Sequence, residues 1–216
     1  MTTTIDPRLQ AALAALSLPG VMIGHRLISA GDETALMARE SAALTNHIVT
    51  VRRASGAARI VARDFLARLG FANCELPKAQ SGAPIWPDDI VGSLAHDKRV
   101  AVAAVARRRD AGALGIDIEP AEPLPPDLLE LVTTPRERRN MNLDPYRGRL
   151  HFVAKEAVYK AVYPRDQIFL EHHDVEIDFA QGKATTRTGH IVELKICISS
   201  HLVVLAFVPP DARLHA

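Results

Sequence analysis

Cysteine is scarce in this chain: its 216 residues include only Cys74 and Cys197. Two cysteines are too few for a disulfide scaffold, and their spacing matches no metal-binding motif. Both are therefore expected to be buried free thiols in a reducing compartment. Long hydrophobic runs are missing as well, because none approaches the ~18 apolar residues of a membrane span. These absences predict a cytoplasmic protein that does not bind membranes.

An excess of charge of one sign is also missing. Lys and Arg number 26, Asp and Glu number 25, and the net charge is +1. A dedicated nucleic-acid-binding protein usually carries a larger basic excess, so no nucleic-acid partner is expected. Hydrophobic residues make up 48% of the chain and charged residues 24%. These values are typical of a globular protein with a buried core and exclude a disordered or collagen-like chain.

Helical and strand-like patterns are interspersed along the chain, which predicts an α+β fold. Boundaries follow from apolar spacing, from alternation and from proline positions. Helices are expected at 7–16, 33–47, 52–69 and 149–162, the last ending before Pro164. Strands are expected at 21–27, 90–95, 100–106, 114–119, 175–179, 183–187, 191–199 and 202–208.

Prolines gather in one short segment near the middle of the chain. Residues 121–127 contain Pro123, Pro125 and Pro126, and such a cluster marks a loop. The segment is the best candidate for a junction between an N-terminal lobe, 1–120, and a C-terminal lobe, 121–216. Helices and strands occur in both parts, so two lobes of similar size are expected.

Two carboxylates share one face of the predicted strand at 114–119. Side chains alternate along a strand, which places Asp117 and Glu119 together and Ile116 and Ile118 on the opposite face. Adjacent carboxylates repel each other, and a hard cation such as Mg²⁺ relieves that repulsion. The alternative is an exposed strand face on which both acids are simply solvated.

A glutamate and a lysine share one face of the predicted helix at 149–162. Glu156 and Lys160 are four residues apart, and Lys155 precedes them. Such a pair could combine a metal ligand or base with a phosphate-binding cation. The alternative is an ordinary salt bridge on the helix surface, worth ~0.3–0.5 kcal/mol.

Two further segments could bind phosphate. His96 ends a predicted strand and Ser93 adds a hydroxyl nearby, whereas the alternative is a turn with a solvent-facing histidine. Arg52, Arg59 and Arg63 lie on roughly one side of an early helix, and arginine suits bidentate phosphate binding. The alternative for that helix is a solvated basic face.

Taken together, the segments resemble a known enzyme family. The chain is similar to the 4′-phosphopantetheinyl transferases of the Sfp and enterobactin synthase component D type in three ordered motifs. These are GSLAH at 92–96, GIDIE at 115–119 and FVAKEAVYK at 152–160. The flanking PIWP at 84–87 and FLEHHDV at 169–175 agree, so the resemblance covers about residues 50–180.

The resemblance implies a fold and a reaction. Members of the family are typically monomers built of two pseudo-symmetric α/β lobes, with the active site between them. They transfer the phosphopantetheine arm of coenzyme A to a serine hydroxyl of an apo acyl, aryl or peptidyl carrier protein. The co-product is adenosine 3′,5′-bisphosphate. A siderophore or other secondary-metabolite pathway is implied by analogy with the enterobactin enzyme.

The resemblance also assigns roles to residues. Asp117, Glu119 and Glu156 would hold Mg²⁺, with Mn²⁺ as an alternative, and Glu156 would complete the metal site or deprotonate the serine. Catalytic roles fall to Glu156 together with two groups that neutralise the coenzyme A pyrophosphate, Lys160 and His96. Lys155 would be a supporting phosphate contact, and Ser93 would lie near the adenosine end.

The 3′-phosphate of coenzyme A would bind to Arg52, Arg59 and Lys78. The earlier arginine of the family falls on Val51 here, so either Arg52 or Arg53 takes that role. Two further departures are Ala95, where the family has a hydroxyl, and Ala83, where it often has a basic residue. Neither position is a metal ligand or a base, so an active enzyme is expected.

The alternative to an enzyme is a protein that only binds its ligands. A non-catalytic module that binds coenzyme A or a carrier protein would retain the arginines but lose a carboxylate. The presence of Asp117, Glu119, Glu156 and Lys160 favours the enzyme. The basic segment at 136–139 could meet an acidic carrier protein, or it could be a solvated helix face.

Overall fold

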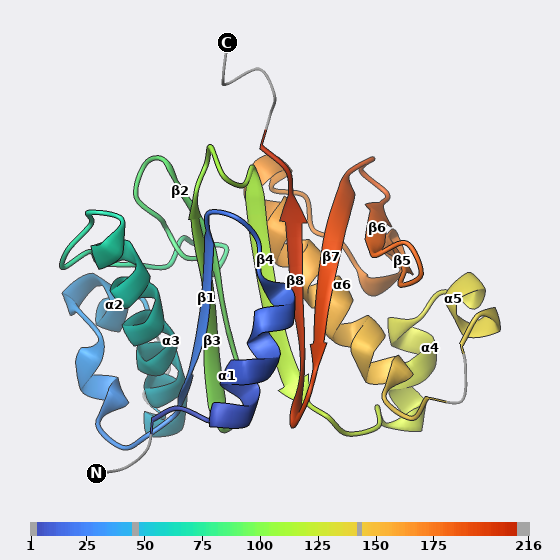
Figure 1. The fold of residues 1–216 in the computed structure, drawn as a ribbon, viewed down its shortest axis with the longest axis horizontal. Coiled ribbons are helices and arrows are strands. Elements are labelled where there is room, and N and C mark those ends of the chain that lie inside the picture. The colour runs from blue at the N-terminus through green and yellow to red at the C-terminus, as the bar shows by residue number, and fades with distance from the viewer. Residues whose placement is uncertain (1–3, 45–47, 142–143, 211–216) are drawn as a thin grey trace.

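The computed structural model describes residues 4–44, 48–141 and 144–210. Its strands are β1 (Val21–Leu27), β2 (Ile90–His96), β3 (Val100–Arg107), β4 (Ala113–Pro120), β5 (Val175–Asp178), β6 (Lys183–Thr186), β7 (Ile191–Ile198) and β8 (His201–Val208). They form two antiparallel sheets that lie side by side, with the orders β1-β3-β2 and β4-β8-β7-β6-β5 (Figure 1). The mixture of helices and antiparallel sheets confirms the predicted α+β class.

One long helix packs on each sheet (Figure 1). The N-terminal sheet carries α3 (Val49–Arg68) and the C-terminal sheet carries α6 (Arg147–Asp166). Shorter elements are α1 (Pro7–Leu13), η1 (Ala14–Leu16), η2 (Asp32–Ala35), α2 (Ala38–Ala42), η3 (Pro126–Leu128), α4 (Leu129–Val132), α5 (Pro135–Arg139) and η4 (His172–Asp174). Among the described residues, no helix has the length and apolar character to cross a membrane.

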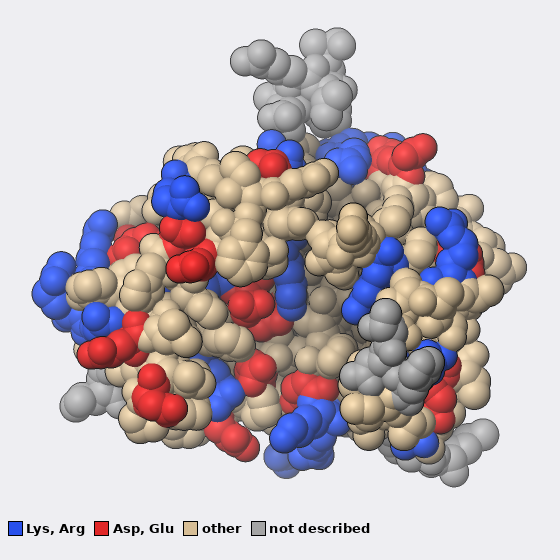
Figure 2. Space-filling view, turned by 180° about the vertical axis from the view of Figure 1, so that it is seen from behind, with Lys and Arg blue, Asp and Glu red and all other residues tan. Residues whose placement is uncertain are grey.

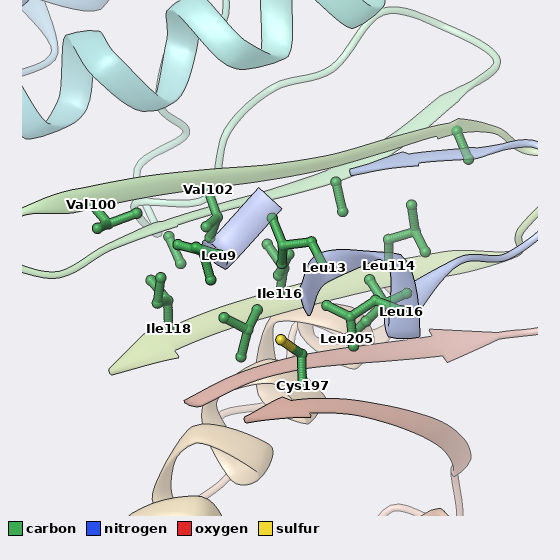
Figure 3. Close-up of a cluster of buried hydrophobic side chains, with 14 of the residues drawn as sticks. Leu9, Leu13, Leu16, Val100, Val102, Leu114, Ile116, Ile118, Cys197 and Leu205 are labelled. Carbon is green, nitrogen blue, oxygen red and sulfur yellow. The ribbon is translucent and has the colours of Figure 1, made fainter. Parts of the chain in front are cut away.

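The strand β4 is buried on both faces. Its even-numbered residues Leu114, Ile116 and Ile118 enter an apolar cluster that also includes Leu9 and Leu13 of α1 (Figure 3). Residues of β2, β3, β7 and β8 complete this cluster, so it joins the two sheets. The odd-numbered residues of β4 turn the other way, towards α6. The alternation predicted from the sequence is confirmed, but the carboxylate face is covered by a helix and not by solvent.

The predicted end of the helix at 149–162 is wrong. The helix expected to end before Pro164 continues to Asp166 and ends where Gln167 adopts a positive φ of 57°. A proline in the last turn removes only one backbone hydrogen bond, and Ala161 and Val162 just before it are buried in the core. Packing of that turn therefore compensates for the lost bond.

The helix expected at 33–47 is interrupted. The chain forms η2, then extends at Leu36 and Met37, and resumes as α2; residues 45–47 lie outside the described part. The break lets the fully buried Glu40 accept hydrogen bonds from the Met37 and Leu76 amides and from Arg63. Apolar spacing does not reveal such a buried polar group.

The pairing of β4 determines on which side of the predicted lobe junction this strand lies. This strand precedes the proline segment 121–127, yet it pairs along its whole length with β8. It is therefore part of the C-terminal sheet. A buried contact of 3.0 Å between Asp97 Oδ2 and His201 Nε2 connects the start of the β2–β3 turn to the start of β8.

Gly115 sets how closely α6 approaches β4. A Cβ added there would lie 1.9 Å from the carbonyl oxygen of Ala157 and 2.7 Å from the amide nitrogen of Ala161. Real Cβ atoms do not approach backbone atoms so closely, so only glycine permits this helix-to-strand contact. The contact brings the odd-numbered side chains of β4 against the side chains of α6.

Gly115→Ala is expected to push α6 away from β4. Overpacking of a core typically costs about 1–3 kcal/mol, and a clash with backbone belongs at the upper end of that range. Urea unfolding should show this loss of stability. The control is Gly148→Ala, which adds the same methyl group near the Leu124 and Leu129 side chains, which can shift. Equal stability of the two variants would contradict the close approach.

Candidate active site

Asp117 of β4 and Lys160 of α6 form the closest ion pair of the site. Lys160 Nζ lies 2.5 Å from Asp117 Oδ1 and 3.4 Å from the Ile116 carbonyl oxygen. Burial raises the pKa of Asp117 to about 6 against the opposing effect of Lys160, and the charges of Glu156 and Glu119 raise it further. The carboxylate is therefore short of positive charge, and a further cation beside it would be stabilised.

Glu119 is held by a residue that the sequence analysis missed. Arg149 Nη1 of α6 donates to Glu119 Oε2 at 2.8 Å. Arg149 precedes Glu156 by two helical turns, so both residues face β4. The only sequence signal was this seven-residue spacing.

Glu156 lies on α6 between these two ion pairs. Its Oε1 is 3.5 Å from Nε2 of His172, whose ring also lies against Phe152. The neighbouring His172 lowers the pKa of Glu156 while burial opposes that effect, and Lys160 lowers it further. Glu156 is thus a carboxylate at neutral pH. His172 was not predicted from the sequence as its partner.

His96 and Lys78 lie on the N-terminal side of the same region. Desolvation lowers the pKa of His96, although part of its ring reaches solvent. The Asp97 carbonyl, 3.3 Å from Nδ1, raises that pKa, whereas the charges of Lys160 and Lys78 lower it further. Desolvation and the charge of Arg59 likewise lower the pKa of Lys78. The predicted phosphate-binding groups Lys160 and Lys78 are therefore both close enough to His96 for their charges to disfavour its protonated form.

A pocket of about 270 Å³ lies where the 81–86 loop and β2 meet α6. Its polar lining includes Ser93, Glu156 and Lys160, and Tyr159 of the same helix also lines it. Figure 2 shows a hollow between the two halves of the molecule, with acidic and basic side chains along it. The remaining lining residues are Ser81, Gly82, Ala83, Pro84, Trp86, Gly92, Leu94, Tyr163 and Pro164.

Lys155 does not reach this pocket. It is 2% exposed, and its Nζ donates to Glu137 Oε2 at 2.7 Å and to the His172 carbonyl at 2.9 Å. Glu137 in turn accepts from the Ile177 amide and caps α5 at Thr134. Lys155 therefore holds the turn that carries His172.

Arg59 is also buried, at 2% exposure. Its Nε and Nη2 donate to the Leu76 carbonyl at 3.0 and 2.9 Å, and its Nη1 donates to Ser55 Oγ at 2.5 Å. Glu40 lies 3.5 Å away. These contacts hold the segment that carries Lys78 against α3.

The two arginines at the start of α3 differ in their partners. Arg53 Nε pairs with Glu33 at 2.9 Å, whereas Arg52 donates to the Ser41 hydroxyl at 2.5 Å. Within the described residues, Arg52 has no acidic partner. Its charge is thus the more available to an anion.

The donor set suits a hard cation. Asp117, Glu119 and Glu156 supply carboxylate oxygens, the ligands that Mg²⁺ prefers. No cluster of three His, Cys, Asp or Glu side chains in the described part of the chain is already arranged around a metal position. Mg²⁺ is usually held by one or two carboxylates and by substrate phosphates, so these three side chains do not all need to reach the ion at once.

Comparison with known proteins matches the chain in two parts. Residues 39–106 match the family described as 4′-phosphopantetheinyl transferase N-terminal domain, and residues 113–209 match the 4′-phosphopantetheinyl transferase superfamily. The chain is 38% identical over 185 residues to 4′-phosphopantetheinyl transferase Svp of Streptomyces mobaraensis, covering 81% of this chain and 75% of that protein. It is 36% identical over 165 residues to 4′-phosphopantetheinyl transferase PptT of Mycobacterium tuberculosis, covering 74% and 69%. Enterobactin synthase component D of Salmonella typhimurium is 34% identical over 88 residues, covering 38% and 36%.

Lys155→Met is expected to destabilise the fold by about 3–5 kcal/mol, because it leaves the buried Glu137 carboxylate without its cation. Urea unfolding measures this loss. The control Lys98→Met removes an exposed ammonium from the β2–β3 turn and should leave stability unchanged. Unchanged stability of Lys155→Met together with lost coenzyme A binding would contradict the structural role.

Proposed function

The chain belongs to the 4′-phosphopantetheinyl transferase superfamily, and from this premise we propose that it transfers the phosphopantetheine arm of coenzyme A to a serine hydroxyl of an apo carrier protein in a Mg²⁺-dependent reaction. The family membership predicted from the three motifs is confirmed, and the chain is an enzyme of this class. One observation carries the proposal: Asp117, Glu119, Glu156 and Lys160 converge where β4 meets α6, beside a pocket. A non-catalytic binding module is not favoured.

The carboxylates would hold Mg²⁺, with Mn²⁺ as the alternative. The ion would neutralise charge on the pyrophosphate oxygens of coenzyme A. Asp117 is buried with its pKa raised, which supports a role as a ligand that is stabilised when a cation is added. Glu119 and Glu156 complete the oxygen donors.

The remaining groups would act on the substrates directly. The serine oxygen forms a bond to the β-phosphorus while the bond to the bridging oxygen breaks, releasing adenosine 3′,5′-bisphosphate. Lys160 and His96 would neutralise the leaving phosphate. Glu156, which is ionised at neutral pH, would bind the metal or accept the serine proton.

The 3′-phosphate of coenzyme A would bind between Arg52 and Lys78. Arg52 lacks an acidic partner within the described residues, and Lys78 has its pKa lowered by desolvation and by Arg59. We place Arg59 behind Lys78, as the group that fixes the Leu76 carbonyl. Ser93 would line the coenzyme A pocket.

The proposal also covers the oligomeric state, the cellular location and the partners. The family resemblance implies a monomer with two lobes, and the pairing of β4 with β8 supports a junction before residue 113. Cys74 and Cys197 are free thiols, which supports a cytoplasmic location. The partners would be coenzyme A and a carrier protein of siderophore or other secondary metabolism, without nucleic acid or membrane.

The transfer itself is tested by intact-mass spectrometry. An apo-carrier protein incubated with the enzyme, coenzyme A and Mg²⁺ should gain the mass of one phosphopantetheine, and EDTA should prevent the gain. Asp117→Asn should lower the rate at least 100-fold, equivalent to about 2.7 kcal/mol of transition-state stabilisation.

The matched control is Asp64→Asn, which removes an exposed carboxylate from α3 and should leave the rate unchanged. A rate for Asp117→Asn within twofold of the control would contradict its role at the metal. Coenzyme A binding without any mass gain on acyl, aryl and peptidyl carriers would instead favour the binding module.

Arg52→Ala should raise KM for coenzyme A about 10-fold or more, since a hydrogen bond to a charged group contributes about 1.5–3 kcal/mol. KM for dephospho-coenzyme A, which lacks the 3′-phosphate, should not change. Arg53→Ala is the neighbouring control, because Arg53 is already paired with Glu33. The assignment of Arg52 fails if both substrates are affected equally.

A further inference from the structure

Within the described part of the chain, Arg149 makes three hydrogen bonds, and all of them go to the segment that follows Asp117. Nη1 donates to Glu119 Oε2 at 2.8 Å, Nε to the Glu122 carbonyl at 2.8 Å and Nη2 to the Pro123 carbonyl at 3.0 Å. Each nitrogen of the guanidinium thus has its own acceptor. The arginine joins α6 both to the end of β4 and to the proline segment.

These contacts leave Arg149 little freedom to move. A guanidinium is planar and rigid, and two of its three nitrogens are fixed by backbone carbonyls. Its side chain is 15% exposed, against 29% for Lys160. Lys160, in contrast, holds Asp117 through a single flexible ammonium. A cation arriving at the carboxylates can therefore displace Lys160 from Asp117 more readily than Arg149 from Glu119.

Glu119 keeps one oxygen for another partner. Arg149 contacts Oε2, and the described residues give the carboxylate no other hydrogen bond. Without Arg149, Glu119 would be free to turn away from Asp117, whose charge repels it. An arginine that fixes one oxygen restricts where the other can lie, and Asp117 is near enough for the charges of the two carboxylates to interact.

We propose that Arg149 is a positioning residue, which fixes Glu119 as a ligand for the divalent metal and couples that ligand to the proline segment 121–127. The inference rests on the metal site proposed above. It assigns to Arg149 no contact with substrate. Removing it should weaken metal binding, although it also removes a competing positive charge.

Metal affinity is measured with Mn²⁺ as the probe, from the electron paramagnetic resonance signal of the free ion, with coenzyme A present and no carrier protein. Arg149→Met should weaken Mn²⁺ binding about 10-fold, as loss of a group that orients a metal ligand typically does. Arg149→Lys keeps the charge and should fall between wild type and Arg149→Met. It also provides the measurement if Arg149→Met does not fold.

A second measurement needs no metal. Hydrogen exchange of the peptide at 118–124 should be faster in both Arg149 variants, because the anchor to Glu122 and Pro123 is lost. Arg165→Met is the matched control: it removes an exposed arginine from the other end of the same helix and should change neither quantity.

The outcomes separate this inference from the proposed function. Unchanged or tighter Mn²⁺ binding in Arg149→Met would overturn the positioning role alone. Weaker coenzyme A binding in EDTA would show direct phosphate contact and overturn it as well. If wild-type protein binds no Mn²⁺, or Asp117→Asn binds it equally, the metal site itself fails and the inference fails with it.

Discussion

The close approach of α6 to β4 at Gly115 is the constraint on which the site depends. The carbonyl of Ala157 occupies the space of a side chain at that position, so the helix lies directly on the strand. Residues two and four positions further along β4, Asp117 and Glu119, then face α6 at short range. Lys160 and Arg149 meet these carboxylates from either side of Glu156. A larger residue at 115 would separate the charges that the chemistry requires to be close.

Three cationic side chains of α6 differ in burial, and their burial separates the one that can meet a substrate from those that stabilise the fold. Lys155 is sealed against Glu137 and holds the His172 carbonyl. Lys160 is partly exposed and lines the pocket, and Arg149 lies between these extremes. Charges that are fully buried must be paired within the protein, because an unpaired one is strongly destabilising. Only the partly exposed cation is left to meet a phosphate, so the helix supplies both a rigid support and a reactive face.

Periodicity predicted which residues share a face, and it could not predict what covers that face. The alternation of 115–119 and the spacing of Glu156 and Lys160 correctly placed the carboxylates and the lysine together. The family resemblance assigned Lys155 and Arg59 to coenzyme A, and periodicity gave no sign that both are buried against partners distant in sequence, Glu137 and Leu76. Arg149 and His172 were missed for the same reason. The partner of Arg149 is set by how α6 crosses β4, and that of His172 by how the 172–174 turn folds back on α6. A single sequence carries no signal for either.

The site lies where it does because β4 belongs to both halves of the molecule. Its even-numbered residues pack under α1 with side chains of the N-terminal sheet, and its odd-numbered residues face α6 of the C-terminal half (Figure 3). The proline segment directly after it was a natural choice of junction from the sequence, yet the pairing with β8 ties the strand to the second sheet. A strand buried on both faces cannot shift without disturbing both cores. Carboxylates placed on it are therefore held at a fixed position relative to His96 and Lys78 on one side and Glu156 on the other, which is the preorganisation that charge stabilisation requires.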